Sequence, residues 1–136
     1  MILLDTNIIA DLLSSSDSVE SDWSRRSYDI AERSDVLVCN PIVLAEIAAG
    51  SDRIDDLLGD LDDLHVEVLP LTIKAAFAGG LAFGEYRRRG GKRDRMLPDF
   101  LIAGHAEALG AVLMTRDRRI GTYFPDLNLI TPETHP

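Results

Sequence analysis

Short apolar runs alternate along the chain with longer stretches in which apolar residues recur at helical spacing. The runs occupy residues 2–4, 36–39, 66–69, 111–114 and 127–130. Short runs of branched aliphatic side chains that are bounded by polar or turn residues are typical of buried strands. The pattern therefore predicts four to five short strands.

The stretches between these runs predict helices. Their expected bounds are residues 7–13, 19–33, 41–49, 51–64, 72–89 and 98–109. The clearest start is Asn40 followed by Pro41, because an Asn side chain caps the first turn and proline is tolerated at the first helical position. Residues 115–121 are expected to form a loop or a short turn.

Alternation of strands and helices indicates an α/β fold in a single domain of residues 1–136. It predicts a doubly wound parallel β-sheet with helices on both faces and right-handed crossovers. A length of 136 residues is sufficient for one substantial core. Gly79, Gly80 and Gly84 weaken the long helix 72–89, and we expect the small residues along it to allow close helix packing.

The composition is that of an ordinary globular protein, with 46% hydrophobic and 27% charged residues. The single cysteine, Cys39, excludes an internal disulfide and a cysteine-based zinc site, and we expect it in the core. The apolar N-terminus lacks the basic segment of a signal peptide, and no apolar stretch reaches the length of a transmembrane helix. We expect a cytoplasmic protein without membrane association.

Two carboxylates directly follow predicted strands. Asp5 follows the run 2–4, and Asp117 lies just beyond the run 111–114. The carboxyl ends of parallel strands lie at one edge of the sheet, where open α/β sheets bind their ligands. We therefore expect Asp5 and Asp117 to lie close together.

Two further carboxylates are notable for their surroundings. Glu46 is the only charged residue in the apolar segment 43–50, and a buried carboxylate is unfavourable unless it is paired or metal-bound. Asp99 opens a helix, where the helix dipole favours a negative charge. From chain direction, however, we expect this helix to start at the opposite edge of the sheet, away from Asp5.

Four carboxylates at one site require a cation or raised pKa values. Two like charges about 4 Å apart repel by about 4 kcal/mol at an effective dielectric of about 20. Oxygen ligands without Cys or His favour Mg²⁺ or Mn²⁺, which bind phosphate oxygens and activate water in phosphodiester hydrolysis. Each acid also has a structural interpretation alone: Asp5 and Asp99 as helix caps, and Asp117 as a turn residue.

The net charge of −9 argues against a passive nucleic-acid-coating protein, which is normally basic. Residues 52–67 are strongly acidic, which is typical of a solvated helix face. The basic residues are concentrated in segments 87–95 and 116–119, beside predicted helix ends and Asp117. The candidates for contact with a nucleic-acid backbone are Arg87, Arg88, Arg89, Lys92, Arg93, Arg116 and Arg118. A solubilising helix end is the alternative for segment 87–95.

Four segments together resemble the PIN-domain ribonucleases and, within them, the VapC toxins of toxin–antitoxin pairs. They are LLDTNII at residues 3–9, NPIVLAEIAAG at 40–50, LPDFLIAGHA at 97–106 and MTRDRRIGTYFPDLNLITP at 114–132. In this order and spacing they span almost the whole chain. The resemblance implies a PIN-like sheet, Mg²⁺- or Mn²⁺-dependent endoribonuclease activity, a homodimer and inhibition by a cognate antitoxin.

The same resemblance implies roles for individual residues. The positions that match its catalytic and metal-binding acids are Asp5, Glu46, Asp99 and Asp117. Asn7 and Thr115 match polar positions that orient those acids. By this resemblance Asp99 belongs to the site, whatever chain direction suggests. The basic residues named above become candidates for binding RNA, or, in segment 87–95, the antitoxin.

Other functions remain open from the residues. One is a catalytically silent PIN-fold module that binds RNA or protein. A phosphoacceptor receiver domain is less favoured, because it needs an acidic pair after the first strand and a late lysine, whereas Asp5 is followed by Thr6 and Asn7. A haloacid-dehalogenase-type phosphatase needs Asp-x-Asp there, and position 7 is Asn. We interpret His105, on the helix behind Asp99, as structural rather than as a general base.

Overall fold

The computed structural model describes residues 1–136 as a five-stranded sheet flanked by seven helices. The strands are β1 (Ile2–Leu4), β2 (Leu37–Cys39), β3 (Val66–Val68), β4 (Val112–Met114) and β5 (Leu129–Ile130). Their order in the sheet is β3-β2-β1-β4-β5, and every neighbouring pair is parallel. The predicted parallel sheet of short strands is confirmed, with β1 at its centre.

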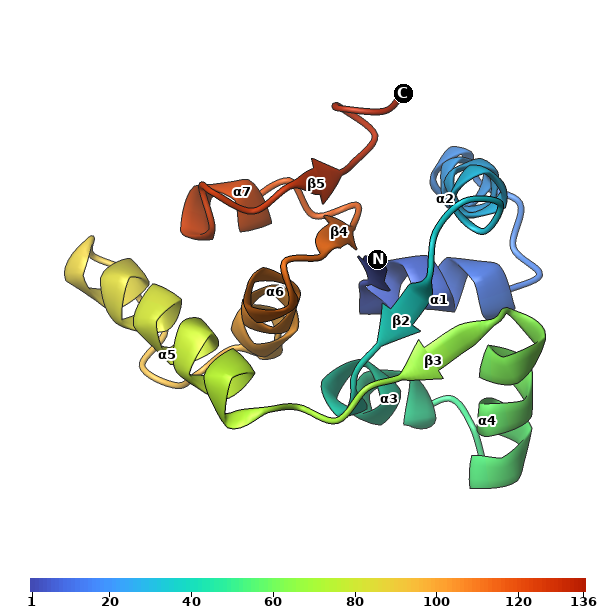
Figure 1. Ribbon diagram of the computed structural model, residues 1–136, viewed down its shortest axis with the longest axis horizontal. Helices are drawn as coiled ribbons and strands as arrows, with labels where there is room; N and C mark the ends of the chain where they lie inside the picture. The colour runs from blue at the N-terminus through green and yellow to red at the C-terminus, as the bar shows by residue number, and fades with distance from the viewer.

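Helices cover both faces of the sheet. They are α1 (Thr6–Leu13), α2 (Val19–Ala31), α3 (Pro41–Ala48), α4 (Ile54–Asp63), α5 (Ile73–Arg88), α6 (Pro98–Leu109) and α7 (Ile120–Tyr123). In Figure 1, α5, α6 and α7 lie to the left of the strands, whereas α2 and α4 lie to the right. This is the doubly wound arrangement that alternation of the elements predicts.

The start of α4 differs from the expected one. The helix begins at Ile54 rather than at residue 51. The Ser51 hydroxyl donates a hydrogen bond of 3.2 Å to the carbonyl oxygen of Arg53. Such local bonds offer the backbone an alternative to helix, so residues 51–53 bend ahead of the helix instead of joining it.

The short helix α7 begins inside the segment expected to be a loop or turn. Ile120 in it and Phe124 just after it are each only 2% exposed, and both belong to the core. A single helical turn is too short to show a period in the sequence. Its burial decides its conformation.

Glycine residues allow α5 and α6 to pack closely. A Cβ atom added to Gly104 would lie 2.5 Å from the backbone nitrogen of Gly79, and one added to Gly79 would lie 2.6 Å from the carbonyl oxygen of Phe100. The predicted close packing is confirmed here. It explains why α5 contains Gly79, although glycine lowers helix propensity. Gly80, in contrast, faces open space.

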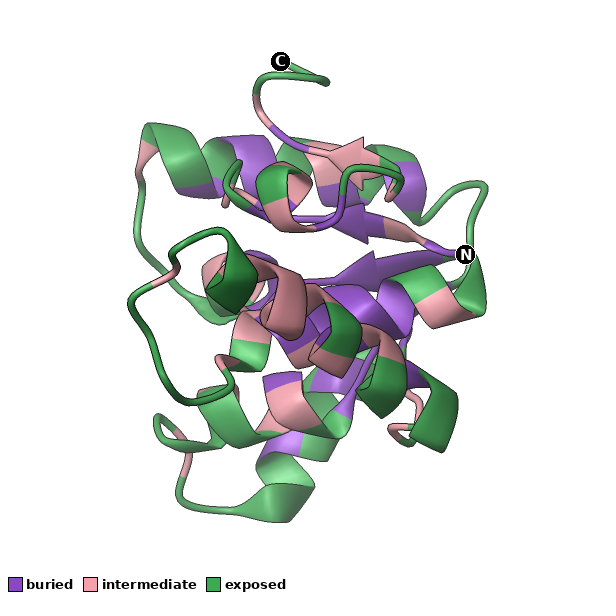
Figure 2. Ribbon diagram, turned by 90° about the vertical axis from the view of Figure 1, so that its left-hand side faces the viewer, coloured by how far each residue is buried: buried purple, intermediate pink, exposed green.

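The core surrounds the central strands. Twenty-two buried residues form one hydrophobic cluster, in which Leu3, Leu4 and Leu113 are fully buried. Cys39 is also fully buried there, as predicted. Figure 2 shows the burial concentrated in the strands and in the helix surfaces beside them. None of the helices combines the length and the apolar character needed to cross a membrane.

Candidate active site

The candidate site is built on the carboxyl ends of two neighbouring strands. β1 and β4 pair with Leu4 opposite Met114, and the backbone nitrogen of Asp5 donates to the carbonyl oxygen of Met114 at 3.0 Å. Asp5 and Thr115 therefore leave the sheet side by side. Asp5 is also the N-cap of α1, which was the structural interpretation of this residue in the sequence.

Three hydrogen bonds fix the Asp5 carboxylate. Its Oδ1 accepts from the backbone nitrogen of Thr6 at 2.7 Å, and its Oδ2 accepts from the Thr115 hydroxyl at 2.6 Å and from Asn7 Nδ2 at 3.2 Å. Asn7 in turn accepts from the backbone nitrogen of Arg116 at 3.1 Å. Asn7 and Thr115 thus both contact the acid that they were expected to orient.

Asp5 is an unusual acid, because only 4% of its surface is exposed. Burial raises its pKa from the ordinary 3.8 to about 6. The hydrogen bonds from Thr115 and Thr6 oppose this rise, whereas the negative charges of Asp99 and Glu46 add to it. All three carboxylates therefore lie within electrostatic reach of one another.

Asp99 lies in the first turn of α6, at the same edge of the sheet. Burial raises its pKa, and the charges of Asp117 and Glu46 raise it further, while Arg119 lowers it. The expectation from chain direction is wrong. A helix that leads into a parallel strand runs back from the carboxyl edge to the amino edge, so α6 begins beside Asp5 and ends where β4 starts.

Glu46 reaches the site from an unexpected environment. The segment that carries it is apolar in sequence, but only Val43 of α3 is buried, and Glu46 itself is exposed. Its Oε1 accepts a hydrogen bond of 2.7 Å from the Thr6 hydroxyl. The suggestion that Glu46 needs a metal because it is buried is therefore wrong, although its charge does act on Asp5 and Asp99.

Asp117 differs from the other acids because it has a cationic partner. The guanidinium of Arg119 binds it in a bidentate manner, with Nε 3.0 Å from Oδ1 and Nη2 2.8 Å from Oδ2. These hydrogen bonds lower the pKa of Asp117. Sequence reasoning missed Arg119 as a site residue, although its two-residue spacing from Asp117 in a turn permits this pairing.

The site fits a divalent cation in its chemistry, but not as a preformed cage. No group of three or more His, Cys, Asp or Glu side chains lies close enough together to hold a metal ion. Asp5 and Asp99 nevertheless have raised pKa values and form no ion pair. Mg²⁺ typically uses one or two carboxylates and keeps several waters, so these two acids are a suitable pair.

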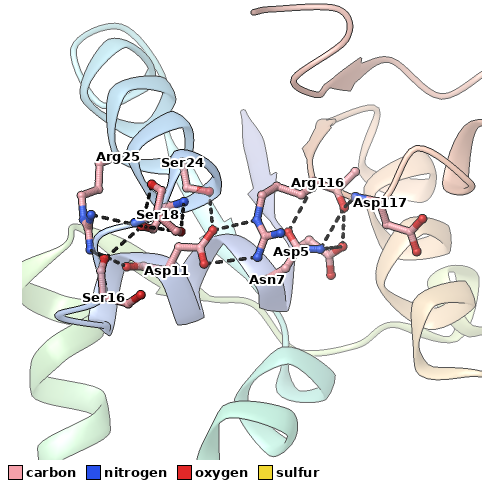
Figure 3. Close-up of polar contacts among 11 residues, drawn as sticks. Asp5, Asn7, Asp11, Ser16, Ser18, Ser24, Arg25, Arg116 and Asp117 are labelled. Atoms are coloured by element: carbon pink, nitrogen blue, oxygen red, sulfur yellow. Dashed lines mark hydrogen bonds and ion pairs between the residues drawn. The ribbon is translucent and has the colours of Figure 1, made fainter.

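Arg116, a candidate for RNA contact, is engaged within the protein. Its guanidinium binds Asp11 of α1, with Nε 2.7 Å from Oδ2 and Nη2 3.2 Å from Oδ1. The Ser24 hydroxyl of α2 donates to the same carboxylate at 2.6 Å. Figure 3 shows this network continuing from Asp5 through Asn7 and Arg116 to α2. The ion pair between Arg116 and Asp11 therefore links the segment after β4 to α1.

The other candidate RNA-binding residues divide into two groups. Arg88 and Arg89 pair with Glu85 on the same helix, and Arg87 donates to backbone carbonyl oxygens of Gly91 and Arg93. The candidates whose exposed side chains form neither an ion pair nor a hydrogen bond are Lys92, Arg93 and Arg118. The second group is free to contact phosphates.

His105 is buried in the α6–α3 contact, with 1% of its surface exposed. Asn40 uses its Oδ1 to cap α3, accepting from the backbone nitrogens of Ile42 and Val43, and its Nδ2 lies 3.2 Å from His105 Nδ1. Nδ1 must therefore be the acceptor, so the proton is on Nε2, which has no partner. Burial lowers the pKa of His105. These contacts agree with a structural histidine.

Comparison with known proteins assigns a family to this fold and site. The family model of the PIN domain matches residues 2–123, so the chain belongs to the PIN domain family. This confirms the resemblance seen in the four sequence segments. It argues against the hypotheses of a receiver domain and of a haloacid-dehalogenase-type phosphatase. A comparison with curated protein sequences gives no match.

Solved structures show the same fold. A chain of the VapBC2 complex from Rickettsia felis, solved with a promoter DNA fragment, is 26% identical, with coverage of 96% of this chain and 98% of that chain and a TM-score of 0.74. A chain of VapBC-1 from nontypeable Haemophilus influenzae is also 26% identical, over 96% and 98% of the chains, with a TM-score of 0.62. FitAcB from Neisseria gonorrhoeae, at 21% identity over 100% of both chains, has a TM-score of 0.69 and shows the fold alone.

Proposed function

We propose that this protein is a VapC-type toxin that hydrolyses RNA phosphodiester bonds with Mg²⁺ or Mn²⁺ bound at the carboxyl edge of β1. The observation that carries the proposal is the approach of Asp5 and Asp99, two acids with raised pKa values and no ion-pair partner. Membership of the PIN family and similarity to chains of VapBC complexes support the toxin assignment.

Asp5 and Asp99 are the proposed holders of the cation, with Glu46 and Asp117 as additional catalytic carboxylates. When bound, such a cation stabilises charge on phosphate oxygens and lowers the pKa of a water molecule. The protein itself orients Asp5 through Thr115, so that the buried carboxylate keeps a single direction. The role that we propose for Glu46, which is exposed at the edge of the site, is to accept a proton from the attacking water.

Arg119 has a proposed role beside these acids. It neutralises Asp117 and lowers the pKa of Asp99. A guanidinium in that place is suited to bind a substrate phosphate in a bidentate manner. Substrate binding would then exchange one oxyanion partner of Arg119 for another and free Asp117 as a ligand.

The partners that we propose are RNA, a cognate antitoxin and a second copy of the chain. An exposed apolar stripe on α5 is suited to the homodimer contact. Ile73, Phe77 and Leu81 are 92%, 66% and 57% exposed, and their four-residue spacing places them on one helix face. We also propose a cytoplasmic location, where the RNA substrate is found.

A catalytically silent PIN module that binds RNA or protein is the second candidate. It is favoured by the absence of three converging metal ligands and by the ion pair between Asp117 and Arg119. Calorimetric titration with Mg²⁺ discriminates between the two candidates. A silent module shows no binding that depends on Asp5 and Asp99, whereas the nuclease loses binding in Asp5→Asn and Asp99→Asn.

The direct test is sequencing of RNA ends after induction of the wild type and of Asp5→Ala, together with cleavage assays on the purified proteins. We expect Mg²⁺-dependent ends with the wild type and none with Asp5→Ala or Asp99→Asn, at unchanged circular dichroism. Asp29→Asn is the matched control, because Asp29 is an exposed acid on α2, outside the site. Retained metal-dependent cleavage by Asp5→Asn at matched purity would overturn the assignment.

A further inference from the structure

A pocket of about 380 Å³ lies between the C-terminal half of α5 and the short helix α7. Its walls include the rings of Tyr86 and Tyr123 and the charged side chains of Glu85 and Arg89. This volume is in the range of small-ligand sites, which combine apolar walls with a few polar groups. The nuclease chemistry proposed above makes no use of these residues.

The aromatic wall of the pocket is held rigidly against the active-site helix. The ring of Tyr123 stacks on Phe100, with centroids 5.0 Å apart and an interplanar angle of 30°. Tyr86 meets Tyr123 edge to face at 5.4 Å and 81°. Phe100 is 1% exposed and directly follows Asp99. The position of the wall is therefore tied to that of a proposed metal ligand.

Arg119 connects the pocket to the acids. Its guanidinium binds Asp117, with Nη2 2.8 Å from Oδ2, and Arg119 directly precedes α7, the helix that carries Tyr123 of the pocket wall. Arg119 is therefore bound to one candidate catalytic carboxylate and lies one helical turn before the pocket wall along the chain.

A turn with two glycines forms the rim of the pocket. Gly90 has φ +90°, and a Cβ atom added to Gly91 would overlap the ring of Tyr86. The Tyr86 hydroxyl accepts a hydrogen bond of 3.3 Å from the backbone nitrogen of Arg93, and Arg87 donates to the Arg93 carbonyl oxygen at 2.8 Å. These contacts hold the basic segment 92–95 beside the aromatic wall.

We propose that this pocket is a nucleobase subsite for single-stranded RNA, in which one base stacks on Tyr123 and the adjoining phosphates follow segment 92–95 and Arg119 towards Asp99. Aromatic platforms beside cationic grooves are the usual means of binding single-stranded nucleic acid. Arg89 uses only its Nε on Glu85, so its terminal amino groups are free for a base edge. The subsite rests on the proposed nuclease function, because its ligand is the RNA substrate.

The test measures binding of a short fluorescein-labelled single-stranded RNA of mixed sequence by fluorescence anisotropy, with EDTA present to prevent cleavage. Base–aromatic stacking predicts that Tyr123→Leu weakens binding by roughly five-fold or more. Tyr123→Phe retains the ring and should bind within about two-fold of the wild type. Thermal unfolding of both variants checks that Leu and Phe are equally tolerated against Phe100.

The salt dependence separates stacking from charge. Lys92→Ala should reduce the slope of log affinity against log salt, whereas Tyr123→Leu should lower affinity and leave the slope unchanged. If the wild type binds and cleaves RNA but Tyr123→Leu binds like the wild type, the subsite is wrong and the nuclease assignment stands. If the wild type neither binds nor cleaves RNA, both proposals fail.

Discussion

The Thr115 hydroxyl, at the end of β4, donates a hydrogen bond of 2.6 Å to Oδ2 of Asp5, at the end of β1. The same Thr115 oxygen accepts from the backbone nitrogen of Asp117 at 3.0 Å. One hydroxyl therefore sets the positions of two acids that are far apart in the sequence. Because it donates to the ionised form of Asp5, it also opposes the rise in pKa that burial causes.

Replacement of Thr115 by valine should shift the pH dependence of cleavage. Without the hydroxyl, the pKa of Asp5 should rise above its present value of about 6. We expect the acid limb of the pH–rate profile to move to higher pH in Thr115→Val, whereas Thr115→Ser keeps the wild-type profile. Superimposable profiles for the wild type and Thr115→Val would show that the hydroxyl does not control Asp5.

Asp5 should lower the stability of the metal-free protein at neutral pH. Its folded-state pKa of about 6 is above the ordinary 3.8, so its contribution to stability is complete below pH 3.8 and is lost as pH rises through about 6. The loss is at most about 3 kcal/mol.

This effect is measured by urea unfolding of the wild type and Asp5→Asn in EDTA. As the pH rises from about 4 to about 8, the unfolding free energy of the wild type should fall relative to that of Asp5→Asn. Equal pH dependence in the two proteins contradicts the burial of an ionised Asp5.

Magnesium should stabilise the wild type at neutral pH. A ligand that binds only the folded state at 100 times its Kd adds about 2.7 kcal/mol to the unfolding free energy. We expect Mg²⁺ to raise the melting temperature of the wild type but not of Asp5→Asn or Asp99→Asn. The control Asp29→Asn should respond like the wild type. An equal response in all four proteins would indicate binding elsewhere.

Alanine at the α5–α6 contact should destabilise the fold. The Cβ atom of Gly104→Ala would meet backbone atoms of Gly79, which cannot move aside like a side chain, so we expect a loss of about 1–3 kcal/mol. Gly80 lies on α5 beside Gly79 but faces open space. Gly80→Ala should therefore raise the unfolding free energy by roughly 0.5–1 kcal/mol through helix propensity. Chemical denaturation of both variants gives the comparison.

Asn40→Ala should destabilise the protein more than the loss of an ordinary cap. It removes the acceptor of two backbone nitrogens and leaves His105 Nδ1 buried without a partner, so we expect a loss of about 2 kcal/mol or more. The control is Thr72→Ala at the exposed cap of α5, which should lose only about 1 kcal/mol. Similar losses in both variants would mean that the contact with His105 contributes little.

Most of the fold was predictable because its signals are local. Apolar runs predicted all five strands, and Asn40 followed by Pro41 predicted the start of α3. Asp5 was predictable as the residue that ends β1 and caps α1. The helix α7 was missed because burial, rather than periodicity, determines a single turn.

The sequence by itself determined the alternation of elements, the caps and the types of residue that could form a carboxylate site, since these depend on spacing and local backbone chemistry. Only the tertiary structure decided which residues meet. The strand order places β4 beside β1, which brings Thr115 to Asp5, and the return direction of α6 brings Asp99 to the same edge. The exposure of Glu46 and the pairing of Arg116 with Asp11 likewise depend on helix packing, because such long-range contacts leave no periodic signal in the chain.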